Sequence, residues 1–278
     1  DIENNDDYLE DLKKQNIKFP KIKGPFSLEY KLNKKLTRLF FDTVSLLTSL
    51  DEDGNETEGV GYYRYRAIEF LAKEEDRKIY GNVGQISNRL SAIMKTLLIK
   101  RLESSFHAFK MSLGRLQKAI DNMIEMFEND RVFIAPDLDI NKLLEEGNSY
   151  DQIEELINKK SIDKPEFQSK NIEYKSEDFY DEFLIHLNAD KVIIDDLVER
   201  WAEVKRDPKL TEFANNIKTE FFDENKNVSG KLVIFTESKE TAEELTGKLN
   251  KIIKQRILII SAENRKIKQN ILEENFDA

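Results

Sequence analysis

An apolar seam of strict heptad spacing constrains this chain more than any other feature. Between residues 102 and 127 an apolar side chain recurs at alternating intervals of four and three residues, which places the set on one face of a helix. The seam consists of Leu102, Phe106, Phe109, Leu113, Leu116, Ile120, Met123 and Phe127. The residues Ile86, Leu90, Ile93 and Leu97 follow the same pattern one residue out of phase. The spacing predicts one helix from Ile86 to Phe127 with a register slip, roughly 60 Å long at about 1.5 Å per residue.

A helix of that length needs a partner to cover its apolar face. A second helix is predicted from Ser176 to Lys205, where Asp207 and Pro208 end it. Its seam consists of Leu184, Leu187, Ile194, Leu197, Trp201 and Val204. We expect the two helices to pack as an antiparallel hairpin, with Trp201 in the core. The acidic stretch from Asn129 to Lys175 is expected to form short helices and loops, and Leu28 to Leu50 is expected to form another helix.

The composition agrees with a mainly helical fold. Charged residues make up 35% of the chain, whereas glycine and proline number only 10 and 5. The absence of cysteine excludes disulfides and thiolate metal sites, and two isolated histidines, His107 and His186, leave little scope for a zinc site. No long apolar run and no secretory signal occur, so we expect a cytoplasmic protein without a membrane partner.

The charge is distributed unevenly along the chain. Six basic residues and one acidic residue lie between Ser91 and Lys118, whereas Asp121 to Glu182 holds 18 acidic and 7 basic residues, in a chain of net charge −10. Lys100 and Arg101 belong to the basic island and are candidates for contact with a nucleic-acid phosphate backbone. The alternative is a solvated helix face, or an intramolecular ion pair with Glu103 or Glu125.

The end of the chain has an α/β pattern. Lys231 to Phe235 and Arg256 to Ile260 are short apolar runs, and each precedes a helical pattern, Lys239 to Leu249 and a helix that ends near Phe276. This order predicts β-α-β-α, the beginning of a parallel sheet. Because two parallel strands cannot bury both faces of a sheet, we expect further strands from sequence outside this chain.

No complete catalytic motif is present in the sequence. It contains no G-x-x-x-x-G-K-[ST], no G-x-G-x-x-G and no H-E-x-x-H. The tripeptide GKL at 247–249 lacks the earlier glycine of a phosphate loop, because Ala242 stands in its place. No nucleophile with a neighbouring base can be nominated, so no catalytic residue is predicted.

Three stretches resemble bacterial Swi/Snf-type superfamily 2 DNA helicases and translocases. The segment KTLLIKRLESSFHAFKMSLGRL (95–116) resembles the region after the first motor lobe. The segments DPKLTEFANNI and KLVIFTESKETAEELTGKL are similar to the entry into the second RecA-like lobe, with VIFTES as motif IV. The opening FPKIKGPFSLEYKLNKKLTRLF resembles the segment after motif III. The resemblance therefore implies a piece of a motor that runs from after motif III to before motif V.

The resemblance also implies an organisation and a set of contacts. Residues 1–85 would be a connector with helices, 86–207 a long-helix hairpin with its acidic connector, and 208–278 an incomplete second RecA-like lobe. Motif IV in such motors lies near a nucleic-acid phosphate, a place that Thr236 and Ser238 match, with Ser261 in the analogous position after the next strand. For Ser238 the alternative role is to cap the next helix.

The expected partners come from the same resemblance. The intact parent would bind ATP, Mg²⁺ and double-stranded DNA, with the remaining motor lobes in cis, whereas this piece would be monomeric, bind no cofactor and hydrolyse no ATP alone. The alternative is a non-enzymatic helical coiled-coil scaffold that binds a partner. A scaffold predicts exposed seams that dimerise, whereas the motor predicts seams that pair with each other.

Overall fold

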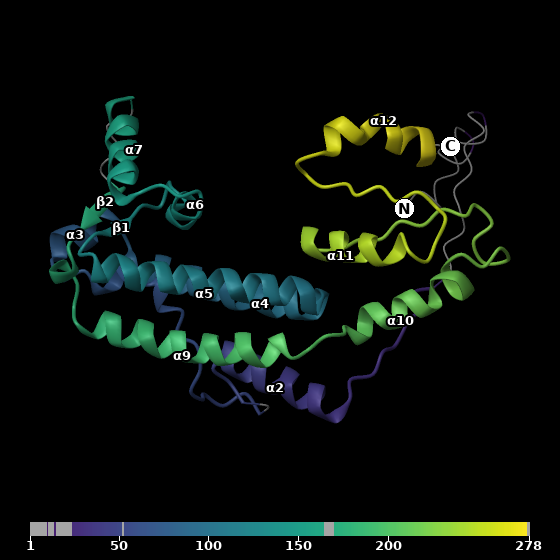
Figure 1. The fold of residues 1–278 in the computed structure, drawn as a ribbon, viewed down its shortest axis with the longest axis horizontal. Helices are drawn as coiled ribbons and strands as arrows, with labels where there is room; N and C mark the ends of the chain where they lie inside the picture. The colour runs from purple at the N-terminus through teal and green to yellow at the C-terminus, as the bar shows by residue number, and fades with distance from the viewer. Residues whose placement is uncertain (1–9, 11–13, 15–23, 52, 164–169, 277–278) are drawn as a thin grey trace.

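The structure, a computed structural model, describes residues 10, 14, 24–51, 53–163 and 170–276. Most of this part is helical, as the composition predicts (Figure 1). The first elements are α2 (Lys34–Thr48), η2 (Tyr63–Tyr65), η3 (Ala67–Phe70), α3 (Glu74–Ile79), α4 (Val83–Ser104) and α5 (Phe106–Glu128). The next are β1 (Val132–Ile134), α6 (Ile140–Glu145), α7 (Tyr150–Asp163), β2 (Ile172–Tyr174) and η4 (Ser176–Asp178). The last are α9 (Glu182–Ala202), α10 (Pro208–Asn216), η5 (Ile217–Phe221), α11 (Lys239–Leu249) and α12 (Arg265–Phe276).

Helices α5 and α9 pack antiparallel and form the centre of the core. All eight seam residues from Leu102 to Phe127 are buried. Phe106, at the start of α5, contacts Trp201 near the end of α9 with ring centroids 4.9 Å apart, whereas Phe127 contacts Phe183 at the opposite ends, 5.4 Å apart. The predicted pairing of the two helices is confirmed, and Trp201 is a core residue without solvent exposure.

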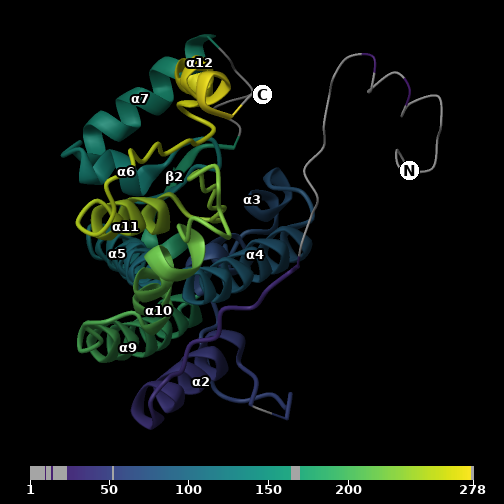
Figure 2. The same ribbon diagram turned by 90° about the vertical axis from the view of Figure 1, so that its right-hand side faces the viewer.

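The predicted single helix from Ile86 to Phe127 is wrong, because the chain turns back at Ser105. The N–H of Ser105 donates the last helical hydrogen bond of α4, to the carbonyl of Arg101 at 3.1 Å, and the extended backbone of Ser105 then ends the helix. The Ser105 hydroxyl then accepts from the N–H of Ala108 at 3.0 Å and begins α5. The buried carboxylate of Asp207 accepts from the N–H of Phe106 at 2.9 Å and stabilises the same helix start. Helix α4 consequently packs against α5 (Figure 2).

The acidic connector contains a small sheet that the sequence pattern did not indicate. Strands β1 and β2 pair antiparallel, with Val132 opposite Tyr174 and Ile134 opposite Ile172. Arg131 beside β1 donates two hydrogen bonds to Glu173 of β2, at 2.6 and 2.9 Å, and one to Glu154 of α7 at 2.8 Å. Strands of three residues are too short for alternation to be recognised, so their pairing depends on contacts between segments far apart in the chain.

The C-terminal part contains the two expected helices, α11 and α12, but not the two expected strands. Residues 231–235 and 256–260 belong to no sheet within the described part of the chain. Val233 is 56% exposed and Phe235 is 93% exposed, although strands of a RecA-like sheet are buried. The physical reason is that a strand is stable only when a neighbour accepts and donates its backbone hydrogen bonds.

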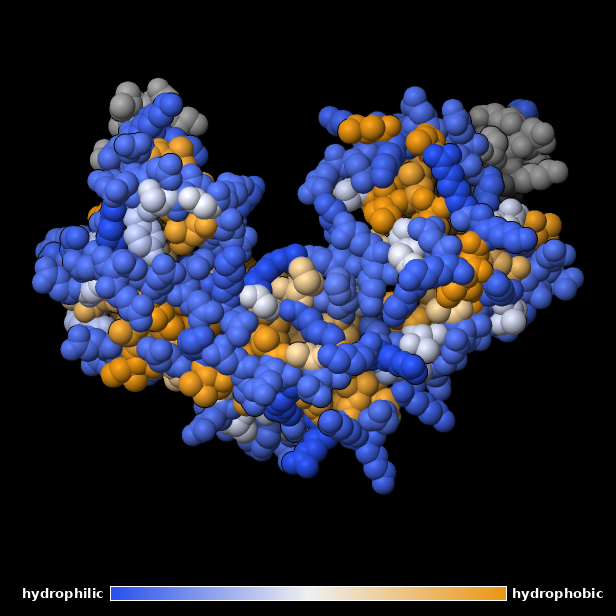
Figure 3. Space-filling view, viewed as in Figure 1, coloured by the Kyte–Doolittle hydropathy of each residue, from blue (hydrophilic) through white to orange (hydrophobic). Residues whose placement is uncertain are grey.

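The molecule has a hollowed face. In Figure 3 the surface is recessed between the part formed by α6 and α7 and the part formed by α11 and α12. Ion pairs connect α5 to both sides, from Lys118 to Glu145 of α6 and from Arg115 to Glu240 of α11, at 3.3 and 2.7 Å. Hydrophobic side chains gather on the surface of the α11–α12 part in the same view. Among the helices described, none has both the length and the apolar character that a membrane span requires.

Candidate nucleic-acid interface

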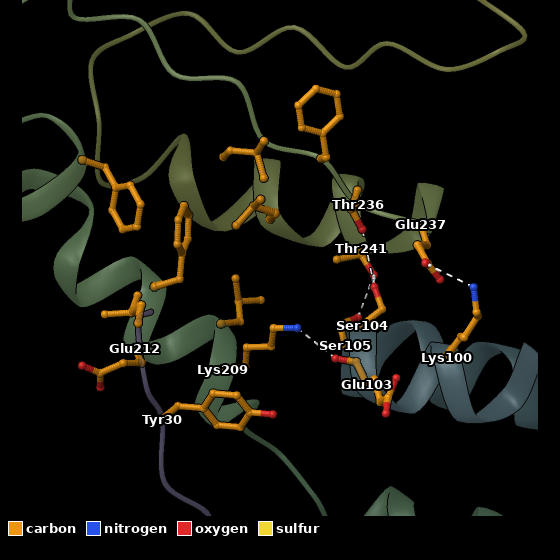
Figure 4. Close-up of a pocket in the computed structure, with 17 residues that line it drawn as sticks. Tyr30, Lys100, Glu103, Ser104, Ser105, Lys209, Glu212, Thr236, Glu237 and Thr241 are labelled. Atoms are coloured by element: carbon orange, nitrogen blue, oxygen red, sulfur yellow. Dashed lines mark hydrogen bonds and ion pairs between the residues drawn. The ribbon is translucent and has the colours of Figure 1, made fainter. Parts of the chain in front are cut away.

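A pocket of about 510 Å³ lies where the end of α4 meets the beginning of α11 (Figure 4). Lys100 and Ser104 reach it from the last turns of α4, and Thr236 and Glu237 reach it from the loop before α11. Apolar side chains of α10, η5, α11, the loop before α11 and the segment before α2 also line the pocket. Three further charged side chains belong to the lining, those of Glu103, Lys209 and Glu212. The structure therefore brings two segments together that are more than 130 residues apart in sequence.

Four hydroxyl groups form a chain across this junction. The Ser104 hydroxyl lies 3.4 Å from the Thr236 hydroxyl and 3.0 Å from the Thr241 hydroxyl. Thr241 in turn donates to the hydroxyl of Ser105 at 3.1 Å. Of these four, sequence reasoning selected only Thr236. The signal for the two serines was available, because both belong to the stretch KRLESS on which the resemblance rests.

Ser238 is the N-cap of α11, the alternative role considered for it. Its buried hydroxyl accepts from the N–H of Thr241 at 3.2 Å and donates to a carboxylate oxygen of Glu240 at 2.8 Å. The cap explains why α11 begins at Lys239. A phosphate could receive the Ser238 proton only if the bond to Glu240 were broken.

The two predicted cations are ion-paired, but not with the acids expected from sequence. Lys100 pairs with Glu237 at 3.4 Å, and Arg101 pairs with Glu240 at 3.2 Å. The expected partner Glu103 lies two residues from Arg101, and side chains at that spacing do not face each other on a helix. The Lys100–Glu237 pair is mostly exposed and contributes little to stability, about 0–1 kcal/mol.

Glu240 is the most strongly perturbed carboxylate of this site. Partial burial alone would raise its pKa, but hydrogen bonds from its own backbone N–H, from Arg115 and from Ser238 outweigh burial and lower the pKa to about 2. The Arg115 pair is short, at 2.7 Å. One carboxylate thus holds α4, α5 and the cap of α11 together.

We expect the Glu240→Gln variant to be about 1–2 kcal/mol less stable than the unmodified chain near neutral pH. The depressed pKa means that the folded state loses this stabilisation as pH falls through the ordinary glutamate value toward about 2. Urea unfolding followed by circular dichroism should therefore show a difference between the two proteins that disappears in acid. Glu237→Gln, at the exposed pair, is the matched control; an equal effect of both substitutions would contradict this role of Glu240.

Ser261 does not belong to the same cluster. It precedes α12, where its N–H donates to the side-chain oxygen of Asn264 at 2.9 Å, and it does not line the pocket. Its own hydroxyl oxygen is buried without a hydrogen-bond partner in the described structure. Of the predicted site residues, Lys100 and Thr236 line the pocket, and Arg101 and Ser238 meet beside it through Glu240. Ser261 has no contact with this group in the described structure.

His107 is exposed on α5, and His186 stacks on Tyr63 with ring centroids 4.3 Å apart. Among the described residues no group of three or more His, Asp or Glu side chains could hold a metal ion. The hydroxyls and the cations Lys100 and Arg101 are donors of the kind that bind an anion. An anion would have to replace Glu237 and Glu240 as partners of these cations, beside the acids Glu103 and Glu212 of the same pocket.

Comparison with protein-family models, with curated proteins and with solved structures finds no match for this chain.

Proposed function

We propose that this chain is part of an ATP-dependent DNA helicase or translocase of the Swi/Snf-like group, with the helices between the lobes and the beginning of the second RecA-like lobe. The observation that carries the proposal is the convergence of Lys100 and Arg101 with Thr236 and Ser238. These residues lie in two of the stretches that carry the resemblance, 95–116 and 231–249, and the resemblance itself does not require the two stretches to touch.

The C-terminal segments supply a second argument. Residues 231–235 and 256–260 have no regular secondary structure and expose apolar side chains, of which Phe235 is the most exposed at 93%. Each precedes a helix, which is the local order of a RecA-like lobe. Neighbouring strands from the rest of such a lobe would cover these side chains and accept their backbone hydrogen bonds.

The proposal assigns ATP and Mg²⁺ to other parts of the motor. The sequence has no phosphate loop, and the described residues offer no cluster of acids for a metal ion. The role proposed for the chain is therefore to contact DNA phosphate through its hydroxyls and cations. Nucleotide chemistry would belong to other parts of the motor.

The test is ATPase activity with and without duplex DNA, for this chain and for a version extended at both ends in its source gene. We expect only the extended protein to turn over ATP, with stimulation by duplex DNA. An extended gene that encodes no phosphate loop and a protein without turnover would refute the proposal.

In the extended protein, Thr236→Val should lower DNA-stimulated turnover by about tenfold, which corresponds to the loss of about 1.4 kcal/mol from a hydrogen bond to a charged phosphate. Turnover without DNA should be unchanged, because the proposed contact is with DNA. Thr219→Val, an exposed threonine on η5, is the matched control. Equal DNA stimulation in both variants would exclude Thr236 from the interface.

A second candidate function is a scaffold that associates with another copy of this chain. The apolar stripe of α4 favours it, since Ile86, Leu90, Ile93 and Leu97 are between 37% and 59% exposed. The α5 and α9 seams, in contrast, cover each other, as the motor proposal expects. Sedimentation equilibrium distinguishes the two: a dimer that Ile93→Glu dissociates supports the scaffold, and a monomer excludes it.

A further inference from the structure

A second pocket, of about 630 Å³, lies between the beginning of α2 and the end of α9. Figures 1 and 2 show these helices side by side, and the segment from Arg200 to Arg206 lines the pocket opposite residues 33–42 at the start of α2. This α2–α9 pocket shares no lining residue with the pocket between α4 and α11. Its lining includes no residue that the sequence analysis proposed as a site.

The α2–α9 pocket is strongly basic in an acidic protein. Its cationic lining residues are Lys35, Arg38, Arg200, Lys205 and Arg206. Only Asp42 and Glu203 oppose them, so the lining carries a net charge of +3, whereas the whole chain carries −10. The two basic groups lie about 165 residues apart in the sequence, and only the packing of α2 on α9 combines them.

Two of these cations have no ionic partner in the described structure. Lys35 and Arg206 are exposed and make no ion pair or side-chain hydrogen bond among the described residues. Asp42 is already engaged, because Arg200 donates to it at 2.9 Å. Lys205 donates to the carbonyl of Ala202 at 2.7 Å and so neutralises the partial negative charge at the end of α9.

The floor of the pocket is apolar and its α2 side is electropositive. Leu36, Leu39 and Val204 line it beneath the charged rim. The beginning of α2 adds the positive end of a helix dipole on the same side as Lys35.

We propose that the α2–α9 pocket binds backbone phosphates of a nucleic acid. Exposed lysine and arginine side chains are the usual phosphate ligands, and arginine can bind a phosphate through two parallel hydrogen bonds. A polymer with regularly repeated phosphates can satisfy Lys35, Arg38 and Arg206 together, whereas a single carboxylate cannot. The choice of nucleic acid over another phosphate polymer rests on the function proposed above, and the pocket would be a second contact with the same DNA.

The test is the binding of a fluorescent DNA duplex to the full 278-residue chain, measured by anisotropy over a salt series. The double variant Lys35→Glu, Arg206→Glu should weaken binding by about tenfold or more and reduce the magnitude of the salt slope by about 2, the effect of losing two phosphate contacts. Circular dichroism checks that the double glutamate variant is folded. The double alanine variant, Lys35→Ala, Arg206→Ala, is measured in the same way and removes the two positive charges without adding negative charge. The matched control is Lys78→Glu, Arg89→Glu, with the same change in net charge at exposed positions of α3 and α4.

The inference is overturned if the pocket variant and the control bind equally, or if the unmodified chain does not bind DNA. Binding of inorganic phosphate that the pocket variant abolishes, without binding of DNA, would also overturn the assignment to nucleic acid. These results do not decide the motor proposal, which depends on ATPase activity of the extended protein. Conversely, DNA binding that depends on the pocket, without ATP turnover in the extended protein, would support the proposed phosphate site and refute the motor proposal.

Discussion

Replacement of Trp201 by alanine should destabilise the protein by about 4 kcal/mol, the largest effect that we expect from a single substitution. The indole is without solvent exposure and packs edge-on against Phe106 and Phe109 of α5, with centroids 4.9 and 5.1 Å away. Its N–H donates to the hydroxyl of Thr43 on α2 at 2.9 Å. Loss of this side chain would leave a cavity where α2, α5 and α9 meet.

Urea unfolding measures this effect. Circular dichroism is the probe, because the variant lacks the only tryptophan of the chain and therefore has no tryptophan fluorescence to follow. The control is Thr43→Val, which removes the hydrogen-bond acceptor but keeps the packing, and should cost about 1–3 kcal/mol. A loss below about 1 kcal/mol in the alanine variant would mean that the α5–α9 contact is not the centre of the core.

The Asp190→Ala substitution should destabilise the protein by about 3 kcal/mol, because it leaves two backbone donors without an acceptor. The carboxylate of Asp190, buried on α9, accepts from the N–H groups of Gly61 and Tyr63, each at 2.7 Å. It thereby attaches the segment before η2 to the core. Glu199→Ala, at an exposed acid of the same helix, should change the free energy of unfolding by less than about 0.5 kcal/mol.

The pH dependence of the Asp190 effect has a defined sign. Burial raises the pKa of Asp190 above its ordinary value, although the two N–H donors oppose that shift. The folded state therefore binds the proton more tightly than the unfolded state, so wild-type stability relative to a non-titrating Asp190→Asn variant should increase as pH falls through the raised pKa. Urea unfolding at several pH values measures the difference, and a change of opposite sign would show that the donors outweigh burial.

The helical core was predictable from the sequence because its signal is local. The spacing from Leu102 to Phe127 identifies a buried face whatever the partner, and the same reasoning located α9 and placed Trp201 in the core. The break at Ser105 was not predicted, since Leu102 and Phe106 keep the heptad step across it. The break depends on the Ser105 cap and on Asp207, which lies about 100 residues later in the chain.

The sequence identified individual residues of the candidate interface but not the contacts between them. Lys100 and Arg101 stood out as part of a basic island, and Thr236 and Ser238 through the resemblance. Their ion pairs with Glu237 and Glu240 and their contacts with Ser104 and Thr241 were not foreseen. Charge patterns identify cations but do not say which distant acid approaches them.

The sequence by itself determined the helical class, the buried faces of α5 and α9, and the cap that begins α11, because each depends on residues within a few turns of one another. Only the tertiary structure decided that α4 turns back on α5, that residues 132–134 pair with 172–174, and that two basic segments share the α2–α9 pocket. The physical reason is range: periodicity and capping act over a few residues, whereas ion pairs, strand pairing and pockets depend on which distant surfaces fit together.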